Sequence, residues 1–294
     1  MDKWQSLNNR TSLSRRAILR GMAALGIAAM TISSFAGSAS AQALLEKIKS
    51  GETIRLGFTN EPPSAYPGDN NEPLGLVNAM TLDVLKKMGT TKIEPVVTDW
   101  GSLVPGLQAG RFDIITGGMW IKPERCRNVL FSEPIALSKD ALVVPKGNPE
   151  NLHSYEDMRD KGLTFATGAG YTAIQDAQKV GIADDKIMQV AGPPEIVQAV
   201  KAGRAAAGVL YNLNAYTLAE KDAAVEVADP FNSAAPSNYP AIAFPLNEQG
   251  AVDAFNAVLK DYIGSDEMMK AVGKYGYTKV MLPDGTTTAE ACKG

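Results

Sequence analysis

Apolar strands and helices alternate along this chain, and the alternating pattern occurs twice. In its first occurrence, strands are expected at residues 53–58, 92–98 and 112–116, with helices between them at 77–87 and 103–109. Gly89 and Gly110 follow the two helices, and glycine is a common residue at a helix end. Alternation of this kind predicts a mostly parallel sheet covered by helices, and hence an α/β fold.

The pattern starts again near residue 140. Strands are expected at 140–145, 163–167, 186–190 and 205–211, with helices at 172–180, 194–202 and 212–220, and a last strand at 241–245 precedes helices at 251–263 and 267–272. We therefore predict two lobes of similar build. Lobe 1 would comprise 44–138 plus 238–294, and lobe 2 would comprise 140–235. Two crossings between the lobes would form a hinge, and a ligand is expected in the cleft beside it.

The first 41 residues have the pattern of an export signal. Arg15 and Arg16 precede a moderately apolar stretch at 21–36, and small residues follow as far as Ala41. Glycine, serine and threonine dilute this stretch, and a membrane span needs ~20 apolar residues. The pattern therefore favours a cleaved twin-arginine-type signal peptide at 1–41 over a membrane anchor, and it predicts a periplasmic protein.

The charge of the remaining chain argues against one class of partner. Removing the signal leaves 29 − 5 basic and 32 − 1 acidic residues, and therefore a net charge of −7. A mildly acidic chain without clusters of basic residues is not typical of a nucleic-acid-binding protein.

Cysteine and histidine are scarce. Cys126 and Cys292 are the two cysteines of the chain, and His153 is its one histidine. An oxidising compartment would allow the cysteines to pair, but two separate thiols are an equally good interpretation. With so few ligands of the usual kinds, neither a zinc site nor a histidine-based catalytic triad is expected. We predict no metal or cofactor.

The run from 117 to 135 contains the strongest candidates for a binding site. It follows the expected strand at 112–116, and it carries Trp120 and Arg125. In open α/β sheets, small ligands bind outside the carboxyl ends of strands. Arginine suits a carboxylate and tryptophan suits a cation, so the predicted ligand is a small zwitterion. Gly117 and Gly118 would let backbone approach it closely. Alternatively, Arg125 lies on the surface and Trp120 in the core.

Further candidates lie on other loops. Glu61 follows the strand at 53–58 and would meet the cationic part of the ligand, unless it is a solvated loop charge. The glycine-rich segment that precedes the helix at 172–180 would offer backbone N–H groups to a carboxylate, or it would be an ordinary turn. The weaker candidates are aromatic residues, which also suit core positions. The candidates from these segments are Tyr66, Trp100, Gly170, Tyr171, Thr172 and Tyr211.

The runs at 100–113 and 117–135 carry a resemblance to a known family. The chain resembles the periplasmic solute-binding proteins of ABC importers for polar amino acids and related zwitterions, and Arg125 falls at the arginine that holds the ligand carboxylate in that family. The resemblance implies a two-lobed type II periplasmic binding protein fold, a monomer that closes on its ligand, and a membrane permease as partner. It also implies an aspartate on the lobe 2 strand for an α-ammonium group, where this chain has Tyr211.

Within that family, the chain most resembles the ectoine and hydroxyectoine binders. The shared segments are 60–66, 123–126 and 282–290. Ectoine has a carboxylate and a delocalised ring cation, so the resemblance assigns Arg125, Glu61, Trp120 and Trp100 to an arginine, an acid and aromatic walls. Ser64 departs from the pattern, because ectoine binders often have an aromatic residue at this position.

We therefore predict a binding protein for ectoine or hydroxyectoine rather than an enzyme. The alternatives are a binder of a polar amino acid or another compatible solute, a sensor that docks on a receptor, and a periplasmic dehydratase on the same fold with Glu61 as its acid or base.

Overall fold

The computed structural model describes residues 43–232 and 237–293. The expected signal peptide at 1–41 lies outside the described residues, as does the end of the range expected for lobe 2. No helix in the described ranges is long and apolar enough to cross a membrane.

The first sheet has the strand order β4-β1-β5-β12-β6. Strand β1 pairs in parallel with β4 and β5, whereas β12 pairs antiparallel with β5 and β6. The strands are β1 (Ile54–Phe58), β4 (Ile93–Val97), β5 (Ile114–Trp120), β6 (Leu130–Phe131) and β12 (Pro240–Phe244). Central strands of this kind are apolar throughout because both of their faces are covered, and β12 is buried at every position.

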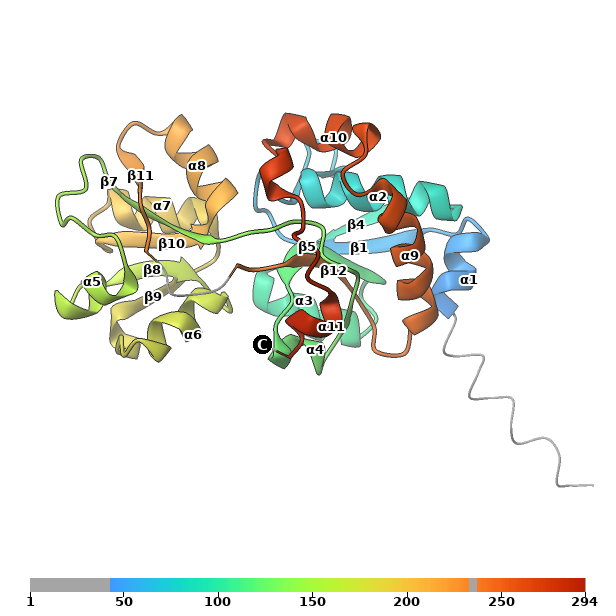
Figure 1. Cartoon of the computed structure of the whole chain (residues 1–294), viewed down its shortest axis with the longest axis horizontal. Coiled ribbons are helices and arrows are strands. Elements are labelled where there is room, and N and C mark those ends of the chain that lie inside the picture. The colour runs from blue at the N-terminus through green and yellow to red at the C-terminus, as the bar shows by residue number, and fades with distance from the viewer. Residues whose placement is uncertain (1–42, 233–236, 294) are drawn as a thin grey trace, which may run out of the picture. The chain divides into compact units, whose positions relative to one another are not determined.

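Helices cover both faces of this sheet (Figure 1). One face packs against α1 (Ala43–Lys49), α2 (Leu76–Met88), α9 (Gln249–Tyr262) and α10 (Asp266–Val272). The other face packs against α3 (Leu103–Gln108), with α4 (Pro123–Cys126) and α11 (Thr288–Ala291) at its border. Neighbouring residues of a strand therefore enter different cores, so that Ile114 faces α2 while Ile115 faces α3.

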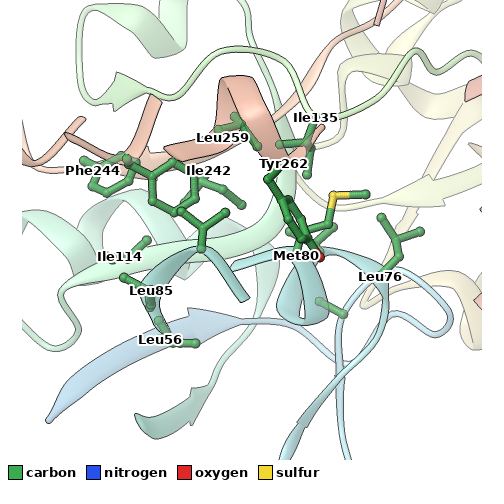
Figure 2. Close-up of a cluster of buried hydrophobic side chains, with 14 of the residues drawn as sticks. Leu56, Leu76, Met80, Leu85, Ile114, Ile135, Ile242, Phe244, Leu259 and Tyr262 are labelled. Carbon is green, nitrogen blue, oxygen red and sulfur yellow. The ribbon is translucent and has the colours of Figure 1, made fainter. Parts of the chain in front are cut away.

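Figure 2 shows the larger of these two cores. Leu56 and Ile114 from the sheet meet Leu85 from α2 and Leu259 from α9, and none of these four side chains is more than 2% exposed. The ring of Tyr262 is buried with them, and its hydroxyl donates a hydrogen bond of 2.6 Å to Asp83. The polar end of this tyrosine is therefore satisfied at the border of an apolar core.

The second sheet has the strand order β11-β7-β10-β8-β9. Strands β8, β9 and β10 are parallel, and β7 pairs antiparallel with both β10 and β11. The strands are β7 (Asp140–Pro145), β8 (Phe165–Gly168), β9 (Ile187–Val190), β10 (Ala207–Tyr211) and β11 (Val225–Ala228). Helices α5 (Tyr155–Asp160) and α6 (Thr172–Lys179) cover one face, and α7 (Pro193–Lys201) and α8 (Asn212–Lys221) cover the other.

The remaining short elements connect these layers. They are the paired strands β2 (Tyr66–Pro67) and β3 (Pro73–Leu74), and the 3₁₀ turns η1 (Trp100–Ser102), η2 (Asp184–Lys186), η3 (Gly273–Tyr275) and η4 (Lys279–Met281). The chain leaves the first sheet after β6 and returns to it at β12. Ser138 and Asn238 pair as an antiparallel bridge where the two connections run together.

Several elements differ from the sequence-based expectations, among them strands β5 and β11. The strand expected at 112–116 begins at Ile114 and continues to Trp120, so Trp120 ends a strand rather than lying on a loop. The extension forms because Met119 and Trp120 pair with Ala241 and Pro240 of β12. Strand β11 was not expected, because it has only four residues and forms by pairing with the distant strand β7.

Cys126 and Cys292 form a disulfide, with 5.9 Å between their Cα atoms. It joins α4, directly after Arg125, to the last turn of the described chain. The bond spans a sequence separation of 166 residues, and it fixes the short helix that carries Arg125 to the C-terminal segment.

Candidate functional site

A cavity lies where loops of the first sheet meet strands and helices of the second. Its volume is ≈ 50 Å³, whereas a single water needs only about 10–15 Å³. The space therefore suits a small molecule and not a peptide. Its lining residues are Glu61, Ser64, Leu76, Val77, Trp100, Gly117, Gly118, Trp120, Arg125, Ala136, Asp140, Tyr171, Thr172, Tyr211 and Pro240.

Arg125 is the basic residue of this lining. Pro123 starts the short helix α4, and Arg125 lies two residues later, just beyond the end of β5. Its guanidinium donates hydrogen bonds to the backbone carbonyls of Trp120 at 3.0 Å and Gly170 at 3.3 Å. It also lies 5.7 Å from the ring centre of Trp100. These contacts orient the guanidinium and leave further N–H donors for a ligand.

Burial lowers the pKa of Arg125 to about 10, and only the neighbouring carboxylate of Glu124 opposes this effect. No ion pair found among residues 43–232 and 237–293 includes Arg125. A buried cation without a counterion costs free energy unless another charged group is brought to it.

Glu61 is a buried acid in the turn after β1. Its backbone N–H donates to the carbonyl of Ala65, and its carbonyl accepts from the N–H of Ser64, both at 2.8 Å. This turn holds the side chain inside the protein, where it is 8% exposed. Burial raises the pKa of Glu61 to about 7, although Tyr171 and Thr59 oppose the shift. The carboxylate oxygen Oε1 has no hydrogen-bond partner within the described residues.

Four aromatic rings form two edge-to-face pairs around the cavity. Trp100 and Tyr171 have ring centres 5.4 Å apart, and Trp120 and Tyr211 have theirs 6.4 Å apart. Each pair joins a residue of the first sheet's elements to one of the second's. The hydroxyls of Tyr171 and Tyr211 are buried, and neither makes a hydrogen bond of ordinary geometry in the described part of the chain. The Tyr171 hydroxyl is nevertheless close enough to Glu61 to oppose the rise in the pKa of that acid. Because buried polar groups are normally paired, these hydroxyls and Glu61 are suited to a polar ligand.

The glycines of β5 allow the chain to pass close to the cavity. Gly118 has φ +71°, which a side chain disfavours, and a Cβ atom there would lie 3.0 Å from a methyl group of Val77. A Cβ atom at Gly117 would lie 3.4 Å from a methyl group of Leu103 and 3.5 Å from the ring of Trp100.

Most residues predicted from the sequence lie around this one cavity. Glu61, Trp100, Gly118, Trp120, Arg125, Tyr171, Thr172 and Tyr211 line it. Gly170 is outside the lining, but its carbonyl holds Arg125 and its backbone lies against Trp100. Tyr66 is also outside it, and its ring packs edge to face on Tyr275 with 6.4 Å between the centres.

The sequence-based prediction omitted Asp140. Its signal in the sequence was a single acid that opens an otherwise apolar strand, 141–144. Ser64 also lines the cavity, and its hydroxyl donates a hydrogen bond of 2.9 Å to Asn214 of α8. A serine there links the two halves of the site.

The donor atoms of the cavity do not suit a metal. Across the residues that the structure describes, no group of three histidine, cysteine or acidic side chains could hold an ion. The lining instead combines one arginine, two carboxyl groups and aromatic faces. That chemistry matches a small molecule carrying both a carboxylate and a cation.

Comparisons with known proteins identify the family of this chain. The family of bacterial extracellular solute-binding proteins, family 3, matches residues 54–278. A probable amino-acid ABC transporter periplasmic-binding protein of Sinorhizobium fredii is 36% identical over 264 residues, which cover 84% of this chain and 85% of that protein.

Solved structures show the same fold. EhuB in complex with hydroxyectoine has a TM-score of 0.77 and 30% identity, over 84% of this chain and 97% of that one. An ancestral amino acid-binding protein, a precursor of cyclohexadienyl dehydratase, has a TM-score of 0.70 and 29% identity, over 79% and 99%. These likenesses confirm the two-lobed type II periplasmic binding protein fold predicted from the sequence. The chain belongs to the bacterial extracellular solute-binding proteins of family 3.

Proposed function

We propose that this protein is the periplasmic solute-binding component of an ABC importer, and that its ligand is ectoine or hydroxyectoine. The observation that carries the proposal is a partly buried guanidinium and a buried carboxyl group that line one cavity and form no ion pair with each other. Arg125 has no counterion in the described chain, and Glu61 has a carboxylate oxygen without a partner. A zwitterion would supply the missing carboxylate to Arg125 and the missing cation to Glu61.

The aromatic rings favour a delocalised cation. Trp100, Tyr171, Trp120 and Tyr211 surround the space with ring faces and edges. A flat ring cation gains from contact with such faces, whereas a compact ammonium group needs several hydrogen-bond acceptors. The relative solved with hydroxyectoine, EhuB, supports this choice of ligand.

The proposed mechanism is closure of two lobes on the ligand. The boundaries proposed for the lobes, 44–138 plus 238–294 and 140–235, are supported by the membership of the two sheets. Hydrogen bonds beside the cavity connect the two proposed lobes. Ser64 bonds Asn214, and Arg125 bonds the carbonyl of Gly170. Closure around a ligand is the usual motion of periplasmic binding proteins. The closed form would then dock on a membrane permease.

The resemblance to the family supports a monomer. Export through the twin-arginine route and removal of residues 1–41 are part of the same proposal. The pairing of Cys126 with Cys292 supports an oxidising compartment.

A second candidate function is a dehydratase-like enzyme. Its support is the presence of two carboxyl groups in the cavity, Glu61 and Asp140, each with a pKa raised to about 7 by burial. Groups that titrate near neutral pH suit acid–base catalysis. Binding without turnover is our primary proposal, since the relatives named above are binding proteins.

Calorimetry on the mature protein tests the proposal. Ectoine and hydroxyectoine are titrated alongside a panel of polar amino acids, and NMR of each mixture detects any product. The proposal is supported if ectoine or hydroxyectoine binds tightly, the amino acids give no binding signal, and no product forms. Binding of an amino acid alone would retain the transport function and refute the ligand, and product formation would favour the enzyme.

A further inference from the structure

Asp140 is an acid in the cavity whose role is not explained by a simple zwitterion. It is the first residue of β7, and it lies opposite Tyr211 of β10 in the antiparallel pair. The bridge between Ser138 and Asn238 comes two residues earlier, where the two connections between the sheets run together. Asp140 therefore lines the cavity beside these connections, on the side of the second sheet.

The protein does not neutralise this carboxyl group. The hydroxyl of Tyr155 donates one long hydrogen bond of 3.3 Å to its Oδ2, the only hydrogen bond to the side chain within the described residues. Lys122 is near enough to lower the pKa of Asp140, but the two form no ion pair in the described structure. Asp176 of α6 is near enough to repel it. Burial and this repulsion raise the pKa of Asp140 to about 7.

Asp140 is nevertheless open to the cavity. Protein surrounds its carboxyl group, yet the residue retains accessible surface. Because Asp140 lines the cavity, a ligand bound there can reach its carboxyl group.

Asp140 and Glu61 come to the cavity from different elements of the fold. Asp140 opens β7 in the second sheet, and Glu61 lies in the turn after β1 of the first sheet. A carboxylate on Arg125 and a cation at Glu61 leave Asp140 as an acceptor for something else.

We propose that Asp140 is a specificity-determining residue, which accepts a hydrogen bond from a hydroxyl group that the ligand carries in addition to its carboxylate and its cation. This inference rests on the proposed function and narrows its ligand class to zwitterions with such an added donor. A site built to bond a hydroxyl discriminates strongly against the analogue that lacks it, because the buried acceptor is then left unpaired.

Ectoine and hydroxyectoine test the inference, because they differ by one hydroxyl group. Both are titrated by calorimetry into the wild-type protein and into Asp140→Ala, Asp140→Asn and Asp176→Asn. Asp176 is the matched control, since its carboxylate is near Asp140 but does not line the cavity. Melting without ligand checks that each variant is folded, and Asp140→Asn preserves the shape of the side chain if Asp140→Ala does not fold.

The expected result is a preference of the wild-type protein for hydroxyectoine of about tenfold or more, which falls below about threefold in Asp140→Ala and persists in Asp176→Asn. A merely structural role would weaken both ligands equally and leave their ratio unchanged, and that result would overturn the inference. Equal wild-type affinities would also overturn it while leaving the proposed function intact. Failure of the wild-type protein to bind either compound would refute the proposed ligand, and the inference would fall with it.

Discussion

Replacement of Arg125 by alanine is the sharpest test of the binding site. The guanidinium is held by the carbonyls of Trp120 and Gly170 and by contact with the ring of Trp100, which position it before a ligand arrives. Preorganised donors lose little entropy on binding. We therefore expect most of the interaction between Arg125 and the ligand carboxylate to appear as affinity.

The magnitude follows from the bonds that are lost. A bidentate carboxylate would accept two charge-assisted hydrogen bonds, each contributing about 1.5–3 kcal/mol. Their loss amounts to roughly 3–6 kcal/mol, and each 1.4 kcal/mol is about a tenfold change in affinity. Arg125→Ala should thus weaken ligand binding by about 10²–10⁴-fold. Arg125→Lys keeps the charge but not the planar fork, so its affinity for the ligand should lie between those of the wild-type protein and Arg125→Ala.

Calorimetry with the ectoines measures the loss, and thermal melting without ligand checks the fold. Because the free protein bears the cost of a buried, unpaired guanidinium, its melting temperature should stay within about 3 °C of the wild-type value. Arg127→Ala is the matched control, since Arg127 is exposed two residues further on and lies outside the cavity. An Arg125→Ala affinity within threefold of the wild-type value would refute the assignment of Arg125 to the ligand.

Three further predictions concern pH, the disulfide and closure. Affinity for a cationic ligand should be complete above pH 7 and fall by up to about tenfold for each pH unit below it, because burial raises the pKa of Glu61 to about 7 and its protonated form cannot pair with a cation. Calorimetry across pH should show that the affinity of Glu61→Gln changes less steeply with pH than that of the wild-type protein, and we attribute the pH dependence that remains to Asp140. An unchanged pH dependence in Glu61→Gln would contradict this reasoning. Serine at both Cys126 and Cys292 should lower the free energy of unfolding by about 2–5 kcal/mol in urea titrations, because the bond closes a loop of 166 residues, and a loss under 1 kcal/mol would be contrary evidence. Asn214→Ala should weaken ligand binding by about tenfold, because Asn214 forms hydrogen bonds with Ser64 and with the carbonyl of Pro62. Calorimetry measures the affinity, and small-angle scattering with ligand measures closure. If neither changes, these hydrogen bonds do not stabilise the closed form.

The sequence allowed much of the lining of the candidate cavity to be predicted, because these residues follow strand ends. Arg125 lies just beyond β5 and Glu61 just beyond β1, and these parallel strands are adjacent in the sheet. The carboxyl ends of adjacent parallel strands lie at one edge, so a local pattern was enough to bring these two residues together. Residues that reach the cavity through packing of longer segments were harder to predict. Tyr66 was chosen as an aromatic beside Glu61, yet its ring packs on Tyr275 instead.

Pairing between distant segments decided what local patterns could not. Trp120 was expected on a loop, but the return of the chain at Pro240 extended β5 to include it. The sequence leaves open whether Cys126 and Cys292 meet, and the packing of α4 and α11 on one border of the first sheet brings them together. Such contacts depend on residues more than a hundred positions apart, and no short window of sequence contains them.

The sequence by itself determined the alternating elements, the α/β class and the residue types needed for a zwitterion, because periodicity and strand-end chemistry are local properties. Only the tertiary structure decided which polar groups face one another inside the cavity. Asp140 looks like an ordinary acid at the start of a strand, and its importance appears only when β7 lies beside β10 and burial removes it from water. Desolvation depends on everything that packs around a group, and that environment is made by the whole fold.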